Sequence, residues 1–122
     1  MKYTFGKEEK LKSRKQIERL FVEGNSLKEF PLRIRFLKLS ESVIPVKAAF
    51  SVPKRNFKLA VKRIRIKRLL RESYRKNKHC LFEELKGEYI VMFLYTDRVE
   101  WKQEDLDKKM ISLLNKFVKS EL

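Results

Sequence analysis

The chain has 122 residues, in which 31 Lys and Arg stand against 16 Asp and Glu, so its formal net charge is +15 and its pI is about 10.1. This length predicts a single domain, 1–122, and a hydrophobic content of 43% is enough to bury a core, which argues against a disordered basic chain. The lone Cys80 excludes an internal disulfide or a zinc module, and no stretch has the apolar length of a membrane span or a signal peptide. We therefore expect a cytoplasmic protein with a polyanionic partner and no membrane partner.

The first predicted element is a short helix. The segment 13–16 (S-R-K-Q) has the spacing of a capping box. Apolar residues follow on one face at Ile17, Leu20 and Phe21, and Gly24 marks the end of the helix.

Two strand candidates come next. Residues 32–39 follow Pro31 and begin by alternating between apolar and basic side chains, which predicts a half-exposed strand. Residues 46–52 form the second candidate, and Pro53 ends it because proline has no N–H to donate to a sheet.

The segment 54–78 is densely basic and contains a single acid, Glu72. Apolar residues recur through it at helical spacing, which predicts a packed helix at roughly 57–77 and not a disordered tail. At about 100° per residue, one side of this helix is mainly apolar and is expected to face the core; it carries Ile66, Leu69 and Leu70, with Ser73 beside them. The opposite side carries Ile64 and an arginine row formed by Arg68, Arg71 and Arg75. Arg63 and Lys67 lie on one flank of that row, and Arg65 lies across from them.

The basic helix has two interpretations. Most charge runs are ordinary solvated surfaces. Here the basic side chains have almost no acidic partner at position i+4, so they repel each other instead of forming ion pairs along the helix. Arg also outnumbers Lys from Arg63 to Arg75. Guanidinium groups are suited to forked phosphate contacts. We therefore favour a nucleic-acid-binding helix over a solvated face.

The remaining elements complete an α+β pattern. Residues 89–95 form the most apolar run of the chain and predict a central strand covered on both faces. A last helix is expected at about 104–119, with an apolar stripe, acids at its start and lysines at its end. The order helix, two to three strands, basic helix, strand, helix predicts a small two-layer α+β sandwich.

Two aromatic residues have an open role. Phe21 lies near the end of the first helix, and Phe36 lies in a strand between Arg35 and Lys38. Each is either a core residue or a platform on which an unpaired base stacks, and the sequence does not decide between these roles.

No pattern typical of a protein active site is found. His79 is the only histidine, the chain has three glycines and no phosphate-cradling loop, and no metal-ligand pair is spaced for binding. We expect no protein catalytic residue and no protein metal site. By its own side chains, the chain is therefore interpreted as a binding protein and not as an enzyme.

The segment around the basic helix resembles the signature of the bacterial ribonuclease P protein component. Residues 50–55 (F-S-V-P-K-R), Ala60-Val61 and 63–72 (R-I-R-I-K-R-L-L-R-E) are similar to a strand F-S-V-S-K-K that leads into G-N-A-V-x-R-N-R-h-K-R-h-h-R-E. Residues 11–24 likewise resemble the family's opening L-K-x-R-x-x-F-x-x-V-F-x-x-G. The resemblance covers nearly the whole chain.

This resemblance implies the accessory subunit of an endoribonuclease that matures the 5′ end of precursor tRNA. The RNA subunit would carry the active site and would hold most of the Mg²⁺. It also implies that the basic helix contacts the catalytic RNA through Arg63, Arg65, Lys67, Arg68, Arg71 and Arg75. The single-stranded 5′ leader would lie in a cleft between that helix and the sheet, near Phe21, Phe36, Lys54 and Arg55. The fold would contain a left-handed βαβ crossover, and the partners would be ribonuclease P RNA and precursor tRNA, with no obligatory protein partner.

One departure from the motif stands out. Ile64 occupies the place of the central Asn of R-N-R, so the hydrogen bonds of that amide are lost. We expect Ile64 to pack under the loop before the helix, against Phe57, with an apolar contact to RNA as the alternative.

Two other functions are compatible with the sequence. One is a ribosomal or other structural RNA-binding protein without a role in cleavage. The other is a reader of the DNA major groove that uses the basic helix.

Overall fold

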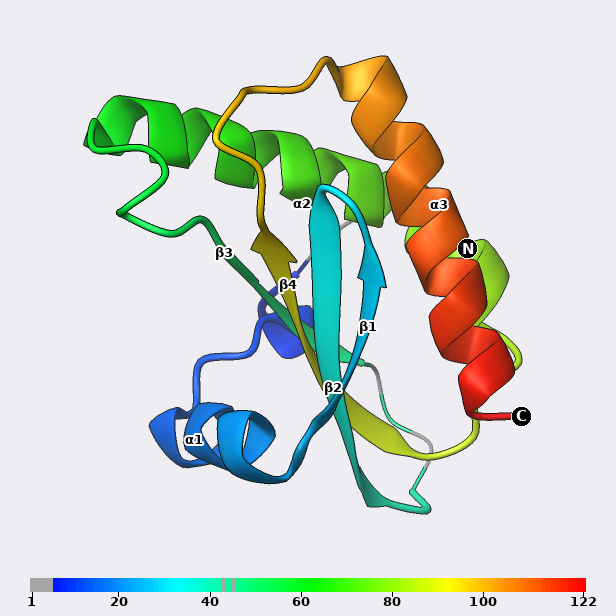
Figure 1. Cartoon of the computed structure of the whole chain (residues 1–122). Coiled ribbons are helices and arrows are strands. Elements are labelled where there is room, and N and C mark those ends of the chain that lie inside the picture. Colours follow the sequence, from blue (N-terminus) through cyan, green and yellow to red (C-terminus); the bar gives the residue numbers. More distant parts are fainter. Residues whose placement is uncertain (1–5, 43, 45) are drawn as a thin grey trace.

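The computed structural model describes residues 6–42, 44 and 46–122, apart from the side chains of 80–82. Its elements, in chain order, are a short 3-10 turn η1 (Lys7–Glu9), α1 (Arg14–Glu23), β1 (Asn25–Glu29), β2 (Leu32–Ser40), β3 (Lys47–Ser51), α2 (Ala60–Phe82), β4 (Glu88–Tyr95) and α3 (Gln103–Ser120). Figure 1 shows the sheet at the centre, with α1 on one side and α2 and α3 on the other.

The four strands form one mixed sheet in the order β1-β2-β4-β3. β2 pairs antiparallel with both β1 and β4, whereas β3 and β4 are parallel and are joined through α2. The predicted α+β class and the crossover through the basic helix are confirmed. The left hand of that crossover stays a prediction from the resemblance.

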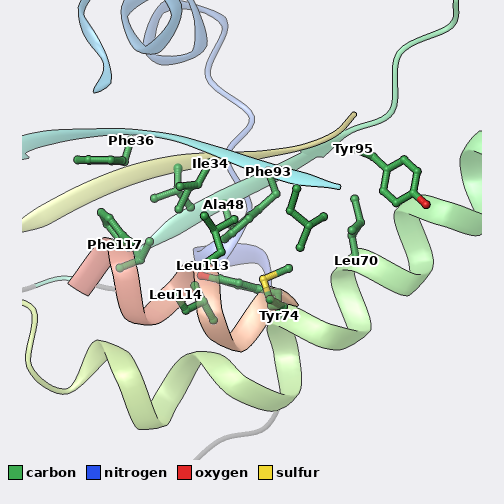
Figure 2. Packing of buried hydrophobic residues seen from close by; sticks show 14 of the residues in the cluster. Ile34, Phe36, Ala48, Leu70, Tyr74, Phe93, Tyr95, Leu113, Leu114 and Phe117 are labelled. Carbon is green, nitrogen blue, oxygen red and sulfur yellow. The ribbon is translucent and has the colours of Figure 1, made fainter. Parts of the chain in front are cut away.

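The larger core lies between the sheet and the two long helices. Alternate residues of β4 point into it, among them Val91 and Phe93, because successive side chains of a strand point to opposite faces. Figure 2 shows Ile34, Phe36, Ala48 and Phe93 on the sheet side. They face Leu70 and Tyr74 of α2 and Leu113, Leu114 and Phe117 of α3. The predicted apolar sides of both helices are therefore the sides that are buried.

The other face of the sheet carries a smaller core. Ile90 and Met92 of β4 pack there with Leu11 and with Leu20 of α1. Partly buried side chains from α1 and the strands extend this cluster: Ile17, Leu37, Leu39, Ala49 and Leu94. α1 thus buries one apolar side against the sheet.

Both ends of α1 follow from the sequence. The Oγ of Ser13 accepts a hydrogen bond from the Gln16 backbone N–H at 3.3 Å, and the Gly24 N–H donates to the Leu20 carbonyl at 3.0 Å. A Cβ on Gly24 would lie 2.3 Å from that carbonyl oxygen. Glycine is therefore the residue that lets the chain turn closely into β1.

Among the described residues, three strands precede α2, in line with the expected two to three. The strand for which the sequence offered no candidate range is β1, which completes a hairpin with β2. The bounds of the basic helix differ from expectation. α2 begins at Ala60 and ends at Phe82, so it starts later and runs further than the predicted 57–77. Phe57 lies before the helix, where it is buried against Tyr95 with ring centroids 6.0 Å apart.

A polar network joins α2 to α3. The Ser73 hydroxyl donates to the Asp107 carboxylate at 2.5 Å, Lys76 donates to the same carboxylate at 2.8 Å, and Gln103 donates to it at 3.1 Å. Burial would raise the pKa of Asp107, but these hydrogen bonds outweigh burial and hold the pKa below its ordinary value. The charged form of Asp107 therefore stabilises the contact between the two helices.

In the described part of the chain, no helix combines the length and apolar character that a membrane crossing needs.

Candidate nucleic-acid interface

The outward side of α2 presents the exposed part of the arginine row. Arg68 and Arg71 are exposed, and no ion pair between described residues engages either of them. Their side of the helix lies opposite the buried Ile66 and Leu70, so the packing of α2 on the sheet leaves both guanidinium groups in solvent. Two unpaired guanidinium groups on one rigid helix can each form a pair of hydrogen bonds with a phosphate of a polyanion.

The third arginine of the row, Arg75, already has a hydrogen-bond partner within the protein. Arg75 donates through Nε to the Glu72 carboxylate at 3.1 Å. That hydrogen bond lowers the pKa of Glu72 below its ordinary value. Some of the hydrogen-bond donors of the Arg75 guanidinium are therefore already used by Glu72 on the same helix.

The cations at the start of α2 have separate roles. Arg63 turns back to the preceding loop, where its Nη1 donates to the carbonyls of Phe57 at 2.6 Å and Lys58 at 2.9 Å. Arg65 forms an exposed ion pair with Glu100, 3.3 Å from Nη1 to Oε2. Arg63 thus shapes the loop before α2, whereas Lys67 lies half-buried on the flank of the helix.

The turn after β3 adds two more positive charges. Lys54 and Arg55 are exposed there, between the end of β3 and the loop that Arg63 holds. The Asn56 N–H donates to the Pro53 carbonyl at 3.2 Å, which closes the turn.

The second face of the sheet contains an aromatic and arginine cluster beside α1. Phe21 is 47% exposed at the end of α1. The Cζ of Arg35 lies 5.4 Å from the centre of the Phe21 ring, and its Nη2 donates to the Phe21 carbonyl at 2.8 Å and to the Leu20 carbonyl at 3.4 Å. Arg35 thereby places a positive charge at the C-terminal end of a helix, where the macrodipole favours it.

Arg33 lies two residues earlier on the same face of β2. It and Arg35 alternate with the buried Leu32, Ile34 and Phe36, so both arginines emerge on the α1 side. The Nε atoms of Arg33 and Arg35 are buried and have no hydrogen-bond partner among the described residues. The protein itself therefore leaves both guanidinium groups incompletely satisfied.

The assignment of Phe36 to an open cleft was wrong. Phe36 is 4% exposed, and its ring packs against Phe117 of α3 with centroids 4.7 Å apart. The expected cleft between α2 and the sheet is filled by the larger core, whereas Phe21 is exposed at the end of α1, which packs on the other face of the sheet. The alternation of β2 contained the signal that would have identified Arg33 and Arg35, because they alternate with the apolar side chains of that strand and must therefore lie on the face opposite to Phe36.

The expected packing of Ile64 against Phe57 was also wrong. Ile64 is 51% exposed, and Phe57 is not part of α2. The assumed shared face required both residues to lie on one continuous helix, and α2 begins three residues after Phe57.

No three His, Cys, Asp or Glu side chains come together as a metal site among the residues that the structure describes. The expectation that catalysis depends on no protein residue stays a prediction.

Comparisons with known proteins point to one family. A family model described as Ribonuclease P matches residues 5–118. The ribonuclease P protein component of Porphyromonas gingivalis is 42% identical over 90 residues, which cover 71% of this chain and 66% of that protein. The corresponding protein of Borreliella afzelii is 30% identical over 104 residues, which cover 85% of this chain and 91% of that protein.

Solved structures agree on the fold. The RNase P protein from Thermotoga maritima superposes with a TM-score of 0.71 at 20% identity, covering 88% of this chain and 96% of that one. The RNase P protein of Staphylococcus aureus gives a TM-score of 0.70 at 19% identity, covering 93% of this chain and 98% of that one. At these identities the likeness concerns the fold alone.

Proposed function

The chain belongs to the ribonuclease P protein family, and we propose that it acts in the cytoplasm as the protein subunit of a ribonuclease P ribonucleoprotein. Its partners would be the catalytic RNA and precursor tRNA, with no obligatory protein partner. The observation that carries the proposal is the pair of exposed, unpaired arginines on α2, Arg68 and Arg71, in a chain of net charge +15.

The outward side of α2 would bind the catalytic RNA. Arg68 and Arg71 would each neutralise a phosphate, with Arg75, Lys67 and Arg65 contributing as their present contacts allow. Such contacts release counterions from the RNA, and this release drives association. Arg63 would act indirectly, by fixing the loop through the carbonyls of Phe57 and Lys58.

The open sheet face beside α1 would hold the unpaired 5′ leader. The exposed face of Phe21 offers a base a stacking surface, and Arg35 and Arg33 offer the leader backbone positive charge. Lys54 and Arg55 would extend this charge along the end of the sheet. Phe36 has no part in this surface, because it is a core residue.

Mg²⁺ held mainly by the RNA subunit would activate the attacking water and stabilise the leaving oxygen. The residues of this chain would position the leader relative to that centre and screen the repulsion between two RNAs. The subunit would thereby lower the Mg²⁺ needed for cleavage and would leave the chemistry to the RNA.

Reconstitution tests the proposal. A bacterial ribonuclease P RNA is mixed with precursor tRNA at low Mg²⁺, with and without the protein, and 5′ leader release is scored. We expect the protein to stimulate cleavage at low Mg²⁺ and to have no activity without the RNA. RNA binding without stimulation at any Mg²⁺ concentration would instead identify a structural RNA-binding protein, and cleavage by an RNA-free preparation would contradict the proposal.

A further inference from the structure

Two exposed apolar side chains stand at the head of the arginine row. Val61 is 68% exposed and Ile64 is 51% exposed, both in the first turns of α2. They are three residues apart on the helix, and Arg68 continues the same side one turn beyond Ile64. This apolar pair, Val61 and Ile64, faces away from the larger core.

The surroundings of the apolar pair are positively charged. Every charged residue from Lys58 to Arg71 is Lys or Arg. The acid from elsewhere that reaches this stretch in a described ion pair is Glu100, which pairs with Arg65. Exposed aliphatic area ringed by cations fits a partner that has both apolar faces and phosphates, and this combination is found in RNA.

The chemistry of the pair restricts the kind of RNA contact. An aliphatic side chain has no donor or acceptor, so it gains free energy only by covering apolar surface. In an A-form duplex the base faces are stacked and closed, and the major groove is too narrow for a helix to enter. A base face becomes available to Val61 and Ile64 where a nucleotide is unpaired or bulged.

We propose that the apolar pair Val61 and Ile64 packs on the face of an unstacked nucleobase in the catalytic RNA, while Arg68 holds a neighbouring phosphate. This inference rests on the proposed function of α2 and specifies its contact. Arg63 leaves this surface clear because its side chain turns back to the loop carbonyls.

Methyl NMR tests the contact directly. The protein is labelled with ¹³C at the isoleucine δ1 methyl groups, and a bacterial ribonuclease P RNA transcript is added to saturation. A methyl group above a base ring moves upfield through the ring current, so we expect a clear upfield shift for Ile64, identified by its loss in Ile64→Val. Ile111, which is 40% exposed on α3, is the internal control and is expected to keep its position.

Affinity measurements provide a second readout. Ile64→Ala is expected to weaken RNA binding about five- to tenfold with an unchanged slope of log affinity against log salt, because apolar contact is lost and no phosphate contact is removed. Ile111→Ala serves as the matched control and is expected to bind normally. An Ile64 methyl that stays in place at saturating RNA, or an Ile64→Ala variant that binds as tightly as the parent, overturns the inference. The absence of any saturable RNA binding would instead contradict the proposed function.

Discussion

Arg35 links the sheet to the C-terminal end of α1 through two carbonyl contacts and one ring contact. Replacement by Ala removes all three, so we expect Arg35→Ala to lower the free energy of unfolding by about 1.5–3 kcal/mol, the usual range for hydrogen bonds to a charged group. Urea denaturation measures this loss. Arg33→Ala is the control, because it lies on the same face of the strand without a described bond to α1, and it should cost less. Equal losses in the two variants would show that Arg35 has no special role.

Glycine is required at position 24 because there is no room for a Cβ atom there. A Cβ there would lie 2.3 Å from the Leu20 carbonyl oxygen and 3.1 Å from the Phe36 carbonyl oxygen, both of which are backbone atoms. Gly24→Ala should therefore cost about 2 kcal/mol or more, seen as a lower melting temperature. Gly6→Ala is the matched control, since a Cβ on Gly6 would meet nothing within 4 Å. A melting temperature unchanged by Gly24→Ala would mean that α1 can end in another way.

The roles of single side chains were the part of the site that the sequence predicted least well. Arg68 and Arg71 were placed correctly because helical periodicity alone decides which side they occupy. Phe36 and Ile64 were misplaced because their environment depends on tertiary contacts, with Phe117 in one case and with the true start of α2 in the other. Arg63 is a similar case, because a motif shows which cation is present and not which carbonyl it contacts.

Among the elements, α2 carries the prediction that bears most directly on RNA binding. Replacing Arg68 and Arg71 by Ala should preserve the fold, because both side chains are exposed. Each lost phosphate contact should flatten the slope of log affinity against log salt by about 0.7 to 0.9. Lys108→Ala combined with Lys119→Ala removes the same charge from exposed positions of α3 and should change the slope less. Equal slopes for the two double variants would mean that net charge, and not the row, drives binding.

The contact between α2 and α3 predicts a pH dependence of stability. The pKa of Asp107 lies below its ordinary value of 3.8, so its charged form stabilises the folded protein above that pH. This contribution is lost as the pH falls through the lower, folded-state pKa. Asp107→Asn should cost about 1–2 kcal/mol at pH 7, and the difference from the parent should shrink below about pH 4. Denaturant titrations at several pH values measure it, and a difference that is constant with pH would contradict the role of the charge.

The sequence predicted which helices and strands are present better than it predicted their first and last residues. The capping residues Ser13 and Gly24 delimit α1 by local chemistry, so the sequence placed this helix correctly. β1 has no alternating apolar pattern, and it is a strand because it pairs with β2. The start of α2 was missed because Phe57 fits helical spacing but is buried from a loop.

Across the whole molecule, the sheet separates the two candidate surfaces. Figure 1 shows α1 on one side of the sheet and α2 and α3 on the other. The exposed arginines Arg68 and Arg71 belong to α2, whereas Arg35 contacts Phe21 at the end of α1. Two RNAs bound at these surfaces would not compete for the same side chains. The sequence contained both sets of residues, but the order of the strands and the packing of the helices decide that they face apart.

The small second core has a consequence for motion. Its fully packed members are Leu11, Leu20, Ile90 and Met92, whereas the core under α2 and α3 is several times larger. Local opening follows the regions with the least buried apolar area, so α1 should detach at a free energy below that of global unfolding. Native-state hydrogen exchange should then show amides of α1 exchanging before those of β4, and equal protection in both would contradict this order. If the proposed leader surface beside Phe21 is used, separate opening of α1 would let it adapt to leaders of different sequence while the rest of the domain keeps a fixed shape.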